Sequence, residues 1–177
     1  ALIDYASKYA WPFAATVLLA PLIRPIRWKS VRAIRFLLNN IVDSLPRKFS
    51  TNSSDHAFQN FLIHDPLQSQ RISLRWVSAL QRWLNELQHS DLGVGPALII
   101  QGDADATVDW RYNVGVIRQL FPASHVEYLP GAGHQLANES DAIRNGYLLL
   151  VENWLTESGI VQDHSATRAG CSGIEPG

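Results

Sequence analysis

The sequence predicts an α/β fold in which three strands form a parallel sheet and helices cross over between them. Two continuous apolar runs, residues 14–20 and 97–101, have the composition of strands that are buried on both faces of such a sheet. Segments with helical periodicity separate the runs, and parallel neighbours require a crossover of this kind. The chain has 177 residues and is 46% hydrophobic, which supplies the core of one ordinary domain.

The N-terminal part is predicted to hold one short helix, one strand and a long insertion. Apolar side chains recur with helical spacing in residues 1–10, and Pro12 ends that pattern. Residues 14–20 form the first predicted strand, which Pro21 closes. From there to about residue 70 the periodicity weakens, four prolines punctuate the chain and residues 50–55 are polar, so this stretch is predicted to be an insertion.

The remaining elements alternate between helix and strand. Residues 72–89 are predicted to form a helix, because apolar side chains recur there at three- and four-residue steps. The following elements are a second strand at 97–101, a helix at 110–121, a third strand at 126–129 and a last helix at 140–155, with Ser140 as its N-cap. The small and polar residues 159–177, which include the single Cys171, are predicted to be disordered.

Charge, cysteine content and motifs argue against several classes of function. Fifteen Lys and Arg against 16 Asp and Glu give a net charge of −1, and so no reason to expect a nucleic-acid partner. No glycine-rich phosphate loop follows a strand, so no cofactor is expected. The spacing of Asp103, Asp105 and Asp109 superficially resembles a calcium loop, but Val108 and Val114 stand where that loop needs Gly and Glu. A metal is therefore not expected either.

Asp105 and His134 are the candidate chemical groups. Each follows a predicted strand by a few residues and lies in a glycine-containing turn. Because ligands bind at the carboxyl ends of parallel strands, an Asp–His pair is predicted there, in which the carboxylate holds one imidazole nitrogen and leaves the other as a general base. Two simpler interpretations stay open, since an Asp in such a turn often bonds only its own backbone and a His in a glycine-rich loop is often only a surface residue.

These two residues also carry a family resemblance. Residues 98–108 and 128–134, which read LIIQGDADATV and YLPGAGH, resemble the last third of an α/β-hydrolase of the lysophospholipase, monoacylglycerol lipase and serine-aminopeptidase branch. The resemblance implies that Asp105 is the acid and His134 the base of a Ser-His-Asp triad, with Asp103 and Asp109 as competing acids. It implies a serine hydrolase whose partner is a small-molecule acyl ester, lipid-like or short.

The same resemblance places the nucleophile outside the chain. Residues 1–20 resemble the helix and strand that follow a Gly-x-Ser-x-Gly elbow, so the elbow is expected immediately before Ala1 and the chain alone is expected to be inactive. Residues 170–174 are a poor substitute, because they lack the last glycine and follow no strand, and neither Ser7 nor Ser140 has an elbow context. The implied organisation is 1–20 after the elbow, 21–70 as a lid, 71–157 as the core with the acid and His loops, and 158–177 as a tail. A non-catalytic pseudo-hydrolase or lid-bearing interaction module is the alternative.

The insertion contains a basic, amphipathic helix. Residues 21–48 hold seven Lys and Arg and one Asp, and residues 26–42 place apolar and basic side chains on opposite arcs of a helix. One interpretation is a lid that contacts an anionic membrane or micelle surface, and the other is a cap helix whose apolar arc packs on the core. A similar choice, between lining an acyl pocket and filling the core, applies to Trp28, Phe36, Phe58, Phe61 and Trp76.

Overall fold

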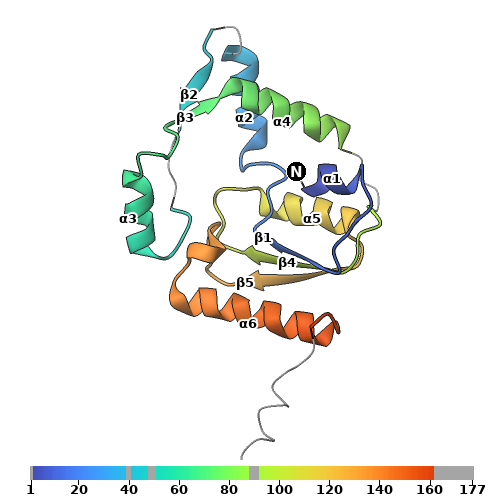
Figure 1. Cartoon of the computed structure of the whole chain (residues 1–177). Helices are drawn as coiled ribbons and strands as arrows, with labels where there is room; N and C mark the ends of the chain where they lie inside the picture. Colours follow the sequence, from blue (N-terminus) through green and yellow to red (C-terminus); the bar gives the residue numbers. More distant parts are fainter. Residues whose placement is uncertain (1, 39–40, 48–50, 88–91, 162–177) are drawn as a thin grey trace, which may run out of the picture.

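The computed structural model describes residues 2–38, 41–47, 51–87 and 92–161 (Figure 1). Residues 162–177, which hold most of the tail predicted to be disordered together with Cys171, lie outside the described residues. No helix in the described ranges combines the length and the apolar character that crossing a membrane requires.

A three-stranded parallel sheet forms the centre of the fold. Its strands are β1 (Thr16–Leu19), β4 (Ala97–Gly102) and β5 (Ser124–Leu129), in the order β1-β4-β5. Figure 1 shows α1 (Leu2–Ala6) and α5 (Trp110–Leu120) on one face of the sheet and α6 (Asp141–Glu157) on the other. The α/β class, the parallel sheet and the flanking helices are therefore as predicted.

Two apolar clusters hold these layers together, and β4 contributes to both. Ile99 packs with α5 and the α1 residue Ala6, whereas Leu98 and Ile100 pack with Tyr147 of α6. Alternate side chains of a strand point to opposite faces, so a central strand with helices on both sides is apolar throughout. Every residue of β4 is buried, as the continuous run predicts.

The prediction that the first strand is buried on both faces is wrong. Val17 and Leu19 of β1 are 36% and 38% exposed. They pair in register with Leu98 and Ile100 and so share the α6 face of the sheet, but α6 packs over β4 and no described helix covers β1 on that side. Among the described strands, β1 has a neighbour on one side only and is an edge of the sheet.

The helix predicted from residue 72 begins two residues later. Residues 71–73 form the short strand β3 (Arg71–Ser73), and α4 (Leu74–Glu86) starts after Ser73, whose hydroxyl accepts the Arg75 N–H at 3.2 Å. The last predicted helix is α6, and Ser140 is its N-cap residue, although its side chain makes no capping hydrogen bond. The helix predicted at 110–121 is α5.

The stretch from Pro21 to Ser73, which we call the long connection, is more regular than its sequence predicts. It contains α2 (Trp28–Leu38), β2 (Ser44–Pro46) and α3 (His56–His64), and β2 pairs with β3 in an antiparallel ladder. The α3 helix is capped by Asp55, whose carboxylate accepts the Phe58 N–H at 3.0 Å. The first and last parts of the connection thus meet at β2 and β3, and α4 packs against α2.

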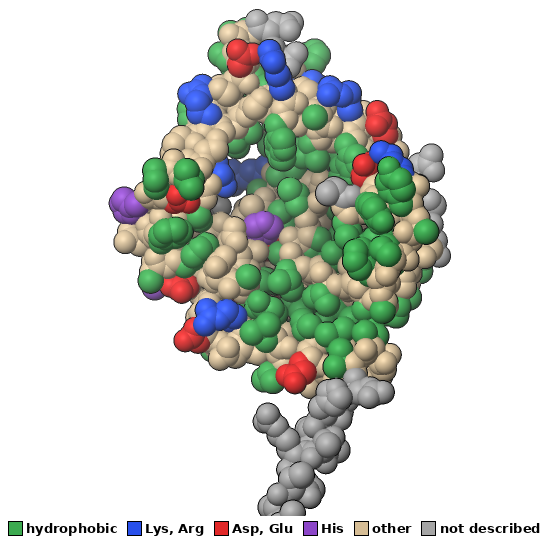
Figure 2. All heavy atoms as spheres, in the orientation of Figure 1, with side chains coloured by type: hydrophobic (Ala, Val, Ile, Leu, Met, Phe, Trp, Pro, Cys, Tyr) green, Lys and Arg blue, Asp and Glu red, His purple; other side chains and the backbone are tan. Residues whose placement is uncertain are grey.

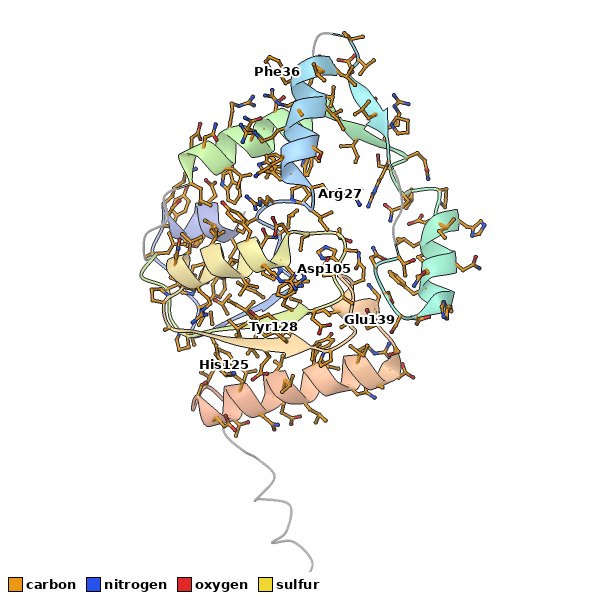
Figure 3. All side chains as sticks on the ribbon, turned by 180° about the vertical axis from the view of Figure 1, so that it is seen from behind. Arg27, Phe36, Asp105, His125, Tyr128 and Glu139 are labelled. Carbon is orange, nitrogen blue, oxygen red and sulfur yellow. The ribbon has the colours of Figure 1, made fainter. Side chains whose placement is uncertain are left out.

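The apolar arc of α2 does not pack on the core, which corrects one of the two sequence-based interpretations. Trp28 is the only residue of α2 that is buried, whereas Ile34 and Leu37 of the arc are 42% and 68% exposed and Phe36, outside the arc, is 79% exposed. Figure 3 shows Phe36 at the end of α2 that is remote from the sheet. Phe61 of α3 and Trp76 of α4 are also exposed and Phe58 is half-buried, so Trp28 alone of the five aromatic side chains is buried.

Candidate active site

The acid and the base predicted from the sequence meet at one edge of the sheet. Asp105 follows β4 and His134 follows β5, and these strands are parallel neighbours, so both loops leave from the same end. The Nδ1 atom of His134 lies 2.9 Å from Oδ2 of Asp105. Figure 3 shows Asp105 at this end of the sheet, beside the start of α5.

Buried hydrogen-bond donors surround the Asp105 carboxylate. Its side chain is fully buried, its Oδ1 accepts the N–H groups of Thr107 at 2.8 Å and Val108 at 3.1 Å, and its Oδ2 accepts Gln101 Nε2 at 3.2 Å as well as His134. Four donors therefore converge on two oxygens. The turn-former interpretation accounts for the two backbone bonds but not for the contact with His134.

The pKa of Asp105 lies below its usual value. Burial acts to raise it, but the hydrogen bond from His134 and those from the Thr107 and Val108 backbone lower it by more. An ionised carboxylate has only acceptors, so the proton of the shared hydrogen bond belongs to Nδ1 of His134. The other ring nitrogen, Nε2, is then the one with a free lone pair.

Further contacts join the acid loop, residues 103–109 between β4 and α5, to the His loop, residues 130–135 after β5. Asp103 accepts the Gly131 N–H at 2.7 Å, and the N–H of Ala104 donates to the Ala132 carbonyl at 3.1 Å. A Cβ on Gly102 would lie 2.2 Å from that same carbonyl oxygen, so only glycine allows the loops to approach this closely. Asp103, one of the two competing acids, is thus bonded to the loop backbone rather than to the imidazole.

Asp109, the other competing acid, is paired with an arginine instead of with His134. Its Oδ2 accepts Nε of Arg24 at 2.9 Å and Nη2 at 2.6 Å, and the guanidinium also lies over the ring of Tyr112. The side chain of Asn113 accepts the Arg24 N–H and donates to the carbonyls of Pro21 and Arg24. This cluster fixes the start of the long connection to the start of α5 and leaves Asp105 as the carboxylate at His134.

His134 itself is partly open to solvent. Its side chain is 22% exposed, and Figure 2 shows that this face of the molecule is hollowed beside α3, with a histidine visible inside the hollow. Within the described residues, no hydroxyl group is hydrogen-bonded to Nε2 of His134: the Ser7 hydroxyl bonds the Asp4 carbonyl, and the Ser140 side chain makes no hydrogen bond to the imidazole. The segment 170–174 lies outside the described residues.

One buried carboxylate near the site has no counterpart in the sequence-based prediction. Glu139 is fully buried next to the His loop and accepts hydrogen bonds from Gly133 and Ser54. Its sequence position, directly before the last helix, resembles an ordinary acidic residue at a helix start, so the pattern gave no signal of burial. In the part of the chain that the structure describes, no three His, Cys, Asp or Glu side chains cluster as a metal site would require.

Comparison with known proteins identifies the family of the chain. The sequence model of the family "serine aminopeptidase, S33" matches residues 1–141. The chain belongs to this family. No curated protein sequence matches the S33-family chain significantly.

Solved structures similar to the S33-family chain show the same fold. The monoacylglycerol lipase of Paleococcus ferrophilus is 20% identical, with a TM-score of 0.69, over 89% of this chain and 64% of the lipase. A soluble variant of the Saccharomyces cerevisiae monoglyceride lipase, solved with a substrate analogue, is also 20% identical with a TM-score of 0.69, over 88% of this chain and 60% of the lipase. The chain thus spans less than two thirds of the length of either lipase.

Proposed function

We propose that this chain supplies the acid and the base of a serine ester hydrolase, with Asp105 and His134 in those roles. The observation that carries the proposal is the 2.9 Å contact between a fully buried, ionised carboxylate and an imidazole at the open edge of a parallel sheet. Membership of a hydrolase family supports it. The substrate class proposed is a carboxylic ester with a lipid-like or short acyl group, for which the fold shared with two monoglyceride lipases is the support.

The proposed reaction is acyl transfer through His134. A serine hydroxyl attacks the ester carbonyl while Nε2 of His134 takes its proton, and the imidazolium then gives that proton to the leaving alcohol. Water repeats the sequence on the acyl-enzyme and releases the acid. Asp105 stays ionised, holds the ring through Nδ1 and stabilises the positive charge that forms on it.

In this proposal the nucleophilic serine comes from outside the 177 residues. The absence of a hydroxyl partner for Nε2 among the described residues supports this, as does the length of the similar lipases. The proposal therefore distinguishes the chain, which should be inactive alone, from the whole protein that carries it.

A serine-directed fluorophosphonate probe and p-nitrophenyl esters of short and long acids test this assignment. The chain, with its folding checked by circular dichroism, is expected to show neither labelling nor turnover. The whole protein is expected to show both, and His134→Ala is expected to abolish both there. A labelled serine in the isolated chain would place the nucleophile within it, and a whole protein that neither labels nor turns over would support the non-catalytic alternative.

We further propose that α2 contacts an anionic lipid surface. Its exposed end carries Phe36 and Leu37, and Lys29 and Arg32 are also exposed on the same helix, which has no acidic residue. Apolar insertion together with attraction to anionic headgroups is how an amphipathic helix binds at a membrane interface. Such a contact would bring the chain, and with it the partly exposed His134, to a source of lipid-like substrates.

Vesicle co-sedimentation of the whole protein tests the contact. Binding to phosphatidylcholine vesicles is expected to rise when phosphatidylglycerol is added, and the double change Phe36→Ser and Leu37→Ser is expected to remove it. Leu148→Ser with Leu149→Ser is the matched control, because these α6 side chains are also exposed but lie on another element. An equal loss of vesicle binding in both double variants would refute a specific role of α2. Binding that does not increase with phosphatidylglycerol content would refute it as well.

A further inference from the structure

Glu139 joins two segments that are far apart in the sequence. It ends the short 3-10 turn η1 (Leu136–Asn138) and is fully buried. Its Oε1 accepts the Gly133 N–H at 2.7 Å, from the residue directly before His134. Its Oε2 accepts the Ser54 N–H at 2.6 Å and the Ser54 hydroxyl, both from the long connection. One carboxylate thus holds the His loop with one oxygen and the connection with the other.

The electrostatics of Glu139 fit a link that is ionised at neutral pH. Burial acts to raise its pKa, but hydrogen bonds from Ser54, Gly133 and Ser140 outweigh burial and keep the pKa below its usual value. A buried carboxylate is costly unless its oxygens are satisfied by donors, and here donors from both segments supply that compensation. Neither segment alone provides all of them.

Contacts around Glu139 extend the same junction. The Ser53 hydroxyl donates to the Asn138 carbonyl at 2.6 Å, and the Gln135 N–H donates to the Asn52 carbonyl at 2.9 Å. A Cβ on Gly133 would lie 2.5 Å from the Asn52 carbonyl oxygen, so the two backbones approach as closely as glycine permits. Residues 52–54 therefore lie against the end of the His loop and the turn η1 that follows it, and α3 begins soon after them.

We propose that Glu139 is a positioning residue that couples the long connection to the orientation of His134. Because Glu139 holds the N–H of Gly133, the residue before His134, a shift of residues 52–54 is transmitted through this carboxylate to the loop that positions the imidazole at Asp105. The importance of this coupling for turnover rests on the proposed function, whereas the coupling itself does not. Figure 3 shows Glu139 apart from Asp105 and on the α6 side of the loops, so it acts through the backbone rather than on a substrate.

The test compares Glu139→Ala and Glu139→Gln with Glu152→Gln, a control at an exposed position of α6. In the whole protein, amide hydrogen exchange is read at Gly133 and Ser54, and the Nδ1 proton of His134 is followed by NMR. Glu139→Ala is expected to accelerate both amides by about tenfold or more and to weaken the Nδ1 proton signal, since each N–H loses a buried acceptor. Glu139→Gln should fall between, because its one carbonyl oxygen can serve only one side.

Steady-state kinetics on the same variants separate positioning from general destabilisation. Glu139→Ala is expected to lower kcat by about tenfold or more while KM changes little, as for a misaligned base. If Glu139→Ala does not fold, Glu139→Gln decides the question with the same readouts. Unchanged amide exchange at Gly133 in Glu139→Ala would overturn the coupling. So would an unchanged Nδ1 proton signal of His134 in a Glu139 variant whose Ser54 amide exchanges faster. If no ester is hydrolysed by the whole protein, the proposed function fails, but exchange and NMR still decide the role of Glu139.

Discussion

The substitution Asp105→Asn tests the acid assignment most directly, because it keeps the shape of the side chain and changes only its hydrogen bonding. Oδ1 of Asp105 accepts two backbone N–H groups, from Thr107 and Val108. The asparagine carbonyl oxygen must take that place, so its NH₂ group faces Nδ1 of His134. Nδ1 then has to accept a hydrogen bond, and the imidazole proton moves to Nε2, the atom that should receive the serine proton.

The geometry also explains why the loss of turnover in Asp105→Asn should be large. The opposite amide orientation would set NH₂ against two N–H donors at 2.8 and 3.1 Å and would leave buried donors unsatisfied, at about 1–3 kcal/mol each. The unproductive tautomer therefore dominates, and kcat should fall by about 10⁴-fold, or about 5.5 kcal/mol of transition-state stabilisation.

The assay is p-nitrophenyl ester turnover by the whole protein, with near-ultraviolet circular dichroism as the check on folding. Asp103→Asn is the matched control, because the Asp103 carboxylate accepts a hydrogen bond only from the loop backbone at Gly131. The Asp103→Asn variant should keep most of the wild-type turnover. A folded Asp105→Asn variant with kcat within about tenfold of the wild type would refute the tautomer argument. The acid role would then pass to Asp103 or Asp109.

Two further predictions concern stability and are read from urea denaturation. Gly102→Ala should lower the free energy of unfolding by about 3 kcal/mol, because its Cβ would overlap a carbonyl of the His loop. The control Gly115→Ala in α5 places its Cβ in open space and should raise the free energy of unfolding by about 0.5–1 kcal/mol. Similar effects at both sites would contradict the close approach of the two loops. The pKa values of Asp105 and Glu139 lie below their usual 3.8 and 4.5, so the unfolded chain binds protons first and stability should fall as the pH drops from about 5 toward 3. The stability difference between wild type and Glu139→Gln should be largest near pH 7 and should shrink toward pH 3; a constant difference would show that this carboxylate has no folding-linked titration.

The elements with strong local signals could be predicted from the sequence. The β4 run, the amphipathic α5 and the α6 pattern are each bounded by Gly or Pro, and their types and order are as predicted. The pairing of Asp105 with His134 follows from the predicted order of strands, because the loops that follow neighbouring parallel strands meet at one edge of the sheet.

The elements of the long connection could not be predicted in the same way. The strands β2 and β3 are three residues each and lie more than twenty residues apart, so their pairing depends on tertiary contact and not on a local pattern. The α3 helix has a sequence signal, because Asp55 at the end of the polar stretch 50–55 is a good N-cap residue. Glu139 has no such signal in the sequence, because the donors that compensate for the burial of its carboxylate include those of Ser54, which is 85 residues away.

These sequence separations also bear on the order in which the chain folds. Asp105 and His134 are 29 residues apart, within the unit of β4, α5 and β5, whereas Ser54 and Glu139 are separated by 85. Closing a longer loop costs more entropy and slows the contact, so we expect the acid–base pair to form earlier in folding than the Glu139 link. Destabilising substitutions at β4 and β5 should then slow refolding, whereas those at Ser54 should mainly speed unfolding. The alignment of the His loop by the connection would be among the last interactions to form and the first to be lost.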